Sequence, residues 1–135
     1  MLFRSIYGPA LGACVALGWL FLVQVLVADF AQIKARHVPG MPVTDGHKSF
    51  HFRATRALAN TNETIALFLL LLALAFLLNA TAAWINTLAP LYVGARALHA
   101  ACYYARWGLA RSIAFGLGLL AQIGLLIACT MALVR

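Results

Sequence analysis

A first group of polar residues able to take part in chemistry stands at the start of a long apolar run. Arg56, Asn60 and Glu63 are spaced by four and by three residues, so in a helix they lie on one face, on successive turns. The spacing carries these groups about 10 Å along the helix into the protein. A guanidinium and a carboxylate on one buried face predict the binding of charged groups.

A second group has the same kind of spacing. Arg96, His99 and Tyr103 are three and four residues apart, which again places them on one face of a helix. If this helix runs antiparallel to the first, the two groups lie at similar depth. Arg111 joins them from the start of the last apolar run, and Lys34 from the end of the first.

The charges in these groups do not balance. Four cations, Lys34, Arg56, Arg96 and Arg111, accompany one carboxylate, Glu63. Ionisable side chains at such depth usually face a bundle interior or a polar cavity, so the sequence predicts a cavity that binds an anion. A structural interpretation stays open, in which Glu63 pairs with Arg96 to hold two helices together and the arginines near helix ends extend to the headgroups.

The elements that position these residues are membrane helices. The chain has 135 residues, of which 64% are hydrophobic and only 13 are formally charged, against roughly 25% charged in soluble domains. We therefore predict a single domain over residues 1–135 with the bilayer as its surroundings. The net charge of +7 forms no basic stripe on a polar body, which argues against nucleic-acid binding.

Four stretches are long enough to cross a bilayer, which takes about 20 apolar residues. We predict helices over residues 6–33, 56–78, 82–104 and 111–134. The small polar residues at 79–81 break an apolar run that is too long for one crossing. The predicted fold is an all-α, integral membrane four-helix bundle with both termini on the same side.

The cations predict the orientation. One side carries nearly all of them: Lys34, Arg36, Lys48, Arg53, Arg56, Arg106 and Arg111. The positive-inside rule places this side in the cytoplasm, and with it the connections between the first two and the last two helices. Short connections and alanine-rich helices suggest a bacterial inner membrane. The connection 34–55 is predicted to be a flexible basic tether or a segment folded over the membrane face.

The pattern of these residues resembles a known family. Residues 56–63, RALANTNE, resemble the RAxxNxxE signature of the MAPEG family, the membrane-associated proteins of eicosanoid and glutathione metabolism. Residues 96–103 resemble its RxxHxxxY element, and Arg111 with Ser112 resembles the pair that opens its last helix. Lys34 resembles the basic residue at the end of the first helix in this family. The resemblance spans the whole chain in the right order.

The resemblance implies a function. MAPEG enzymes are homotrimers that bind glutathione between subunits near the cytoplasmic face, and several conjugate it to lipophilic electrophiles or use it as a thiol cofactor. It implies Arg111 as the catalytic residue that stabilises a thiolate, without a metal. The implied glutathione-binding residues are Lys34, Arg56, Asn60, Glu63, Arg96, His99, Tyr103 and Ser112.

Two positions depart from the family pattern. Phe115 stands where the prostaglandin E synthase branch has tyrosine, so no phenol is available there and prostaglandin isomerisation is not implied. Ala59 replaces an arginine that some members place before the asparagine. A glutathione S-transferase or peroxidase acting on a lipophilic substrate is the expected activity.

Other functional classes stay open at this point. The chain would serve as a catalytically silent glutathione-binding or scaffolding protein if the site were kept without turnover. A small transporter with Glu63 as proton relay is disfavoured by the surrounding cations. A haem-binding subunit would need two histidines on facing helices, whereas only His99 lies in a predicted helix.

Overall fold

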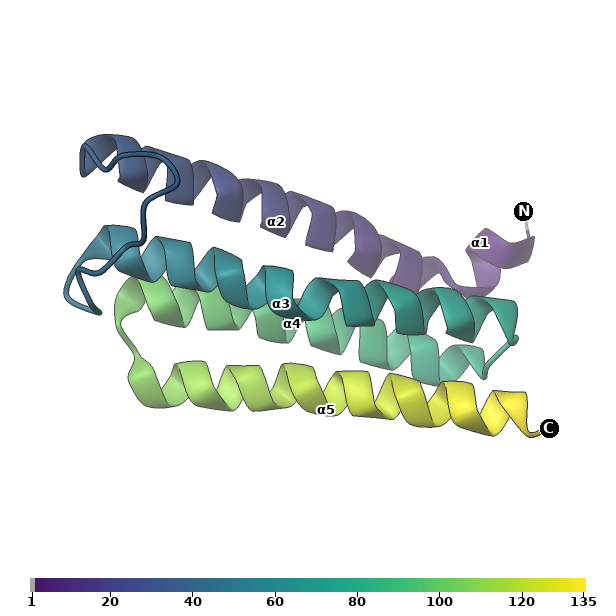
Figure 1. Cartoon of the computed structure of the whole chain (residues 1–135). Helices are drawn as coiled ribbons and strands as arrows, with labels where there is room; N and C mark the ends of the chain where they lie inside the picture. Colours follow the sequence, from purple (N-terminus) through teal and green to yellow (C-terminus); the bar gives the residue numbers. More distant parts are fainter. Residues whose placement is uncertain (1) are drawn as a thin grey trace.

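The computed structural model describes residues 2–135, which form five helices and no strand. They are α1 (Leu2–Ile6), α2 (Gly8–Lys34), α3 (Phe50–Leu77), α4 (Ala82–Ala105) and α5 (Gly108–Leu133). The long helices lie side by side, with α3 and α4 between α2 and α5 (Figure 1). Both termini lie at one end of this array, and the connections 35–49 and 106–107 lie at the other (Figure 1). The all-α prediction is confirmed.

The second predicted helix begins earlier than expected. We predicted a start at residue 56, but α3 begins at Phe50, and the connection from α2 is shortened to residues 35–49. The reason is a helix cap, because the Ser49 hydroxyl accepts a hydrogen bond from the Phe52 N–H at 3.4 Å. This bond satisfies one of the free N–H groups of the first turn. Arg56 therefore lies in the second turn of the helix.

The first predicted helix is divided in two. The chain bends at Tyr7, so that Ile6 belongs to the short helix α1 and the long helix α2 begins at Gly8. Pro9 lies in the first turn of α2, where its missing N–H is tolerated. The bend places the Tyr7 hydroxyl 3.5 Å from the Ala80 carbonyl oxygen, to which it donates.

In each of the two remaining connections, a residue of positive φ follows the end of the helix. Asn79 has φ 49° after α3, which confirms the predicted break at residues 79–81, and Arg106 has φ 66° after α4. Helix α4 passes Pro90 without interruption. Helix α5 begins at Gly108, earlier than the predicted residue 111, so Arg111 completes the first turn with its N–H bonded to the Trp107 carbonyl.

Three helices are long and apolar enough to cross a membrane, namely α2, α3 and α5. Their outward faces carry many exposed large apolar side chains, such as Trp19, Leu70 and Leu120. Helix α4 has 24 residues, which is sufficient length, but it carries the polar residues of the second group. It packs against α2, α3 and α5, and α3 likewise packs against the three other long helices.

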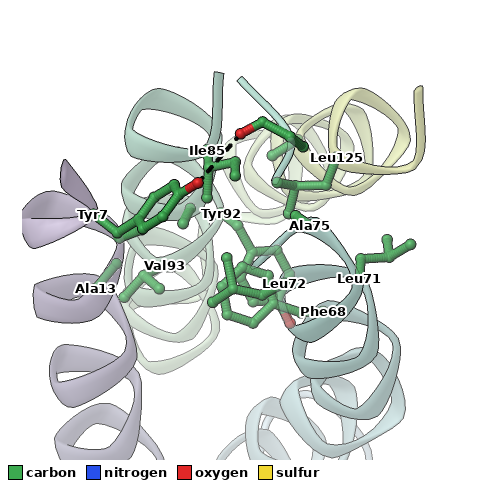
Figure 2. Packing of buried hydrophobic residues seen from close by; sticks show 14 of the residues in the cluster. Tyr7, Ala13, Phe68, Leu71, Leu72, Ala75, Ile85, Tyr92, Val93 and Leu125 are labelled. Carbon is green, nitrogen blue, oxygen red and sulfur yellow. Dashed lines mark hydrogen bonds between the residues drawn. The ribbon is translucent and has the colours of Figure 1, made fainter. Parts of the chain in front are cut away.

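An apolar core fills the end of the array that holds the termini. The rings of Phe68 from α3 and Tyr92 from α4 stack 4.2 Å apart where this core borders the polar interior. Figure 2 shows these rings together with Leu72 from α3, Ile85 from α4 and Leu125 from α5. The core ends near Tyr92, and polar side chains occupy the interior from there toward the connection 35–49.

Candidate functional site

An open pocket of about 250 Å³ lies beside the polar interior, where α3, α4 and α5 meet. Each helix contributes side chains that the sequence places far apart. The pocket is lined by Asn60, His99, Tyr103, Arg111, Ser112 and Phe115. Five of these are predicted site residues, and only Phe115 was considered for its departure from a family pattern.

Arg96 is the buried cation behind this pocket. Its side chain is 1% exposed, and Nη1 donates to the Asn60 carbonyl oxygen at 3.3 Å and to the Thr64 hydroxyl at 3.2 Å. Its Nε and Nη2 have no hydrogen-bond partner. A buried guanidinium with unpaired donors is costly, so an anionic ligand within reach would be bound favourably.

Arg111 is held against an aromatic ring. Its Cζ lies 4.6 Å from the centroid of the Tyr103 ring, a distance typical of a cation–π interaction. The Tyr103 ring in turn meets the His99 ring edge to face, with centroids 5.1 Å apart. His99 Nδ1 is buried without a hydrogen-bond partner. The three side chains form one continuous lining on α4 and α5.

Phe115 borders both the open pocket and a small enclosed void next to Arg96. Its ring centroid lies 5.3 Å from the Arg96 Cζ and 5.9 Å from the His99 ring centroid. The neighbouring Ser112 is exposed, and its hydroxyl donates to the Gly108 carbonyl oxygen at 3.3 Å. Phe115 thus supplies an apolar, cation-binding face where a tyrosine would supply a hydroxyl.

Four predicted site residues do not line this pocket, namely Arg96, which is buried behind it, and three exposed residues. Lys34 is exposed at the end of α2, and Arg56 and Glu63 are exposed on α3. Arg96 bonds to the Asn60 carbonyl and to Thr64 rather than to Glu63, so the structure does not contain the Glu63–Arg96 pair that the structural interpretation invoked. A single chain brings only part of the predicted set together.

The sequence analysis missed three polar residues that position Arg96. The Thr64 hydroxyl shares a hydrogen bond with the Tyr92 hydroxyl at 2.9 Å, and Gln122 Nε2 donates to the Thr64 carbonyl oxygen at 2.8 Å. The sequence did contain a signal for two of them. Thr64 lies four residues after Asn60, and Tyr92 lies four residues before Arg96, so each residue extends the polar face of its helix by one turn. Gln122 is an isolated polar residue in an apolar helix.

Metal ligation finds no support in the arrangement. Among residues 2–135, no group of three or more His, Cys, Asp or Glu side chains comes together in a way that would hold a metal ion. The chemistry available at the pocket is therefore that of guanidinium, imidazole, phenol, hydroxyl and amide groups. Such a set binds anions and orients a ligand through hydrogen bonds.

The comparisons with known proteins agree with the sequence pattern. The model of the MAPEG family matches residues 9–131, which is nearly the whole chain. No curated protein and no solved structure matches the chain significantly. The matched range includes every residue that lines the pocket.

Proposed function

Because this chain belongs to the MAPEG family, we propose that it binds glutathione and uses it as a thiol nucleophile against a lipophilic electrophile. It is an integral membrane protein of a family concerned with glutathione and eicosanoid metabolism. The proposed activity is that of a glutathione S-transferase or peroxidase. The proposed substrate enters from the bilayer, because exposed apolar side chains surround the pocket-bearing helices.

The observation that carries this proposal is the convergence of five predicted site residues on one pocket. They come from three helices and lie up to fifty-two residues apart in the sequence, from Asn60 to Ser112. Shared helical faces predicted each group separately, but their meeting in one cavity depends on how the helices pack. Purely structural polar contacts would not need an open pocket beside them.

Glutathione would supply the negative charge that the pocket lacks. Glutathione carries two carboxylates, an ammonium group and a thiol. Arg111 lies on the pocket lining and offers a charged donor to a carboxylate or to the thiolate sulfur. Arg96 lies behind that lining, next to the small void, with two buried nitrogen atoms that have no hydrogen-bond partner, so it adds positive charge near the ligand. We assign the recognition of the ammonium group to Glu63.

Arg111 is the proposed catalytic residue. A guanidinium in the first turn of a helix favours a bound thiolate by its own charge and by the helix dipole, which lowers the thiol pKa of glutathione. In transfer, the thiolate forms a bond to the electrophilic carbon of the substrate and the leaving group departs with its electron pair. In peroxide reduction, the thiolate attacks the distal oxygen, an alcohol leaves, and a second glutathione completes the disulfide with loss of water.

Three predicted glutathione-binding residues that are exposed on a single chain support a site shared between copies of the chain. Lys34, Arg56 and Glu63 are exposed on a single chain, and exposed charges at membrane depth are costly in lipid. We infer that residues 1–135 form one domain with four crossings, α4 included, and that three copies assemble so that these residues reach a neighbouring pocket. The connections 35–49 and 106–107 then face the cytoplasm, in a bacterial inner membrane.

The test is glutathione binding to the detergent-solubilised protein. Glutathione should raise the melting temperature of the wild type, because it binds the folded state. Arg96→Met keeps the volume of the buried side chain but removes its donors, and it should weaken glutathione binding by about tenfold or more, which corresponds to about 1.4 kcal/mol per factor of ten. Arg4→Met removes a cation at the opposite end and serves as the matched control.

Two outcomes contradict the proposal. An unchanged melting temperature of the wild type at saturating glutathione would end the binding claim. Equal weakening by Arg96→Met and Arg4→Met would mean that glutathione responds to net charge rather than to the pocket.

A further inference from the structure

A second pocket, of about 240 Å³, lies at the end of the array that holds the connections. It is formed where α3 begins, α4 ends and α5 begins. Its lining consists of His47, Arg53, Cys102, Tyr103, Arg106, Trp107, Gly108 and Arg111. Tyr103 and Arg111 also line the glutathione pocket, but the remaining residues have no role in the proposed function.

The lining is strongly cationic. Arg53, Arg106 and Arg111 bring three guanidinium groups to one cavity, and no carboxylate is among the lining residues. Like charges gathered without a counter-charge repel one another. An anion in this cavity would relieve that repulsion, so the charge of the pocket indicates the sign of its ligand.

Arg53 provides independent evidence for a missing partner. Its side chain is only 8% exposed, and Nη1 donates to the carbonyl oxygens of His47 and Lys48, both at 2.9 Å. These bonds fix the end of the connection 35–49 over the pocket. The Nε of Arg53 is buried without a hydrogen-bond partner, which leaves a charged donor available to a ligand.

The backbone N–H groups in the first turn of α5 also lack a capping side chain at this pocket. Its N-cap residue, Trp107, makes no side-chain cap hydrogen bond, and Gly108 at the helix start lines the pocket. The first backbone N–H groups of a helix have no partner within the helix and carry its positive dipole end. A phosphate group at this position would accept hydrogen bonds from those N–H groups.

Arg106 stands in a conformation that favours glycine. It follows the end of α4 with φ 66°, its N–H bonds to the Tyr103 carbonyl, and the Trp107 N–H bonds to the Cys102 carbonyl. At this position of a helix end, glycine is the usual residue, because other side chains are strained there. This conformation fixes the point at which the Arg106 side chain leaves the backbone, beside the start of α5 and on the pocket lining.

The pocket lies at the end of the helix array, beside the connection 106–107, where Trp107 is 63% exposed. Tryptophan is enriched at the boundary between the bilayer and water, so lipid headgroups are expected at this level. We propose that this pocket binds a phosphate group, supplied by the headgroup of an anionic phospholipid or by free phosphate, and that the bound phosphate completes the start of α5. The proposal does not depend on glutathione binding.

Arg106→Gly is the decisive variant, because it relieves backbone strain while removing one of the three guanidinium groups. Arg36→Gly is its matched control. Arg36 follows the end of α2 with φ 51°, lies exposed near the same membrane face and does not line the pocket. Both variants lose one positive charge and both gain glycine at a position of positive φ, so they differ only in the pocket.

Two probes distinguish the sources of phosphate. Inorganic phosphate is titrated in detergent at constant ionic strength with the melting temperature as readout, and phosphatidylglycerol is titrated in phosphatidylcholine-containing mixed micelles with bound lipid counted by native mass spectrometry. The wild type and Arg36→Gly should bind at least one probe equally well, and Arg106→Gly should bind it about tenfold more weakly. If only the lipid binds, the ligand of the pocket is the phospholipid headgroup. If phosphate binds, alone or together with the lipid, the free anion is sufficient as a ligand.

Three results would overturn the proposal. They are no response of the wild type to either probe, equal weakening in Arg36→Gly and Arg106→Gly, and loss of the phosphate response at saturating glutathione. The last result would mean that the pocket belongs to the glutathione site. Glutathione binding itself should be unchanged in Arg106→Gly, so a failure of this proposal leaves the proposed function standing.

Discussion

The guanidinium of Arg111 lies over the ring of Tyr103, with Cζ 4.6 Å from the ring centroid. The two residues come from different helices, α5 and α4, and both line the proposed glutathione pocket and the cationic pocket next to it. Because a long arginine side chain has many rotamers, the ring restricts the positions that the guanidinium adopts. Tyr103 is therefore a positioning residue for Arg111.

This relationship predicts different effects for two substitutions of Tyr103. Tyr103→Phe keeps the ring and should leave the turnover rate at saturating glutathione within about twofold of the wild type, whereas Tyr103→Leu should lower it by up to about thirtyfold, the range that a cation–π interaction provides. Steady-state rates with a chlorinated nitrobenzene measure both. If the two variants lose turnover equally, the phenol rather than the ring is needed.

A second prediction concerns the hydroxyl of Thr64. It accepts a hydrogen bond from Arg96 and shares one with Tyr92. Thr64→Val therefore leaves the buried Tyr92 hydroxyl without a partner and leaves Arg96 Nη1 with the Asn60 carbonyl oxygen as its remaining acceptor. We expect a loss of about 1–3 kcal/mol of stability, seen as a lower melting temperature in detergent. Thr64→Ser keeps the hydroxyl and should behave like the wild type. A Thr64→Val protein as stable as the wild type would contradict this account of Arg96.

Helical periodicity predicted the buried face of α4 correctly. Arg96, His99 and Tyr103 are all buried, because their shared face of α4 meets side chains of α3 and α5. The same reasoning was incomplete for α3, where Asn60 is half-buried but Arg56 and Glu63 are exposed. Periodicity shows which residues share a face and does not show whether that face meets the same chain, lipid or a second copy.

Some helix boundaries were also predicted from the sequence and others were not. The break at residues 79–81 was predicted because small and polar residues interrupt an apolar run, and in the structure Asn79 has a positive φ there. The start of α3 was missed because apolar and polar residues alternate over residues 50–55, FHFRAT, and give no apolar run, although Ser49 is a good capping residue. His51 and Arg53 are buried at that start, and such tertiary burial of polar residues has no simple sequence pattern.

The third prediction tests whether the glutathione site is shared between copies. Lys34 is exposed at the end of α2, and α3 and α4 separate α2 from the helix that carries Arg111 (Figure 1). If Lys34 completes the pocket of a neighbouring copy, Lys34→Gln and Arg111→Ala subunits should complement one another. Co-expression should restore roughly one quarter of wild-type turnover, since random assembly gives that share of sites with both native residues.

Each variant expressed alone is the control and should show low turnover. Native mass spectrometry of the co-expressed sample must show mixed trimers for the assay to be informative, and trimers are the expected assembly. Mixed trimers without any recovered activity would mean that Lys34 and Arg111 act within one chain or that Lys34 has no role in the site.

The last prediction separates catalysis from binding. Arg111 lines the pocket in the first turn of α5, where it favours the thiolate, whereas Arg56 is exposed on α3 and is assigned to a carboxylate of glutathione. Arg111→Ala should lower turnover and raise the pKa of the bound thiol, with a smaller effect on glutathione affinity. Arg56→Ala should weaken glutathione binding with less change in the rate at saturation.

A pH series of thiolate absorbance, recorded with saturating glutathione, gives the thiol pKa for the wild type and both variants, and steady-state rates give the other parameters. Because Arg111 stabilises the charged form, the wild-type curve should lie at lower pH than the Arg111→Ala curve, and the difference in turnover should shrink as the pH rises and the variant's thiol also ionises. Equal losses of rate and affinity in the two variants would contradict the division of roles. A thiol pKa that is the same in solution and when bound to the wild type would leave Arg111 as a cation at a helix end without a catalytic role.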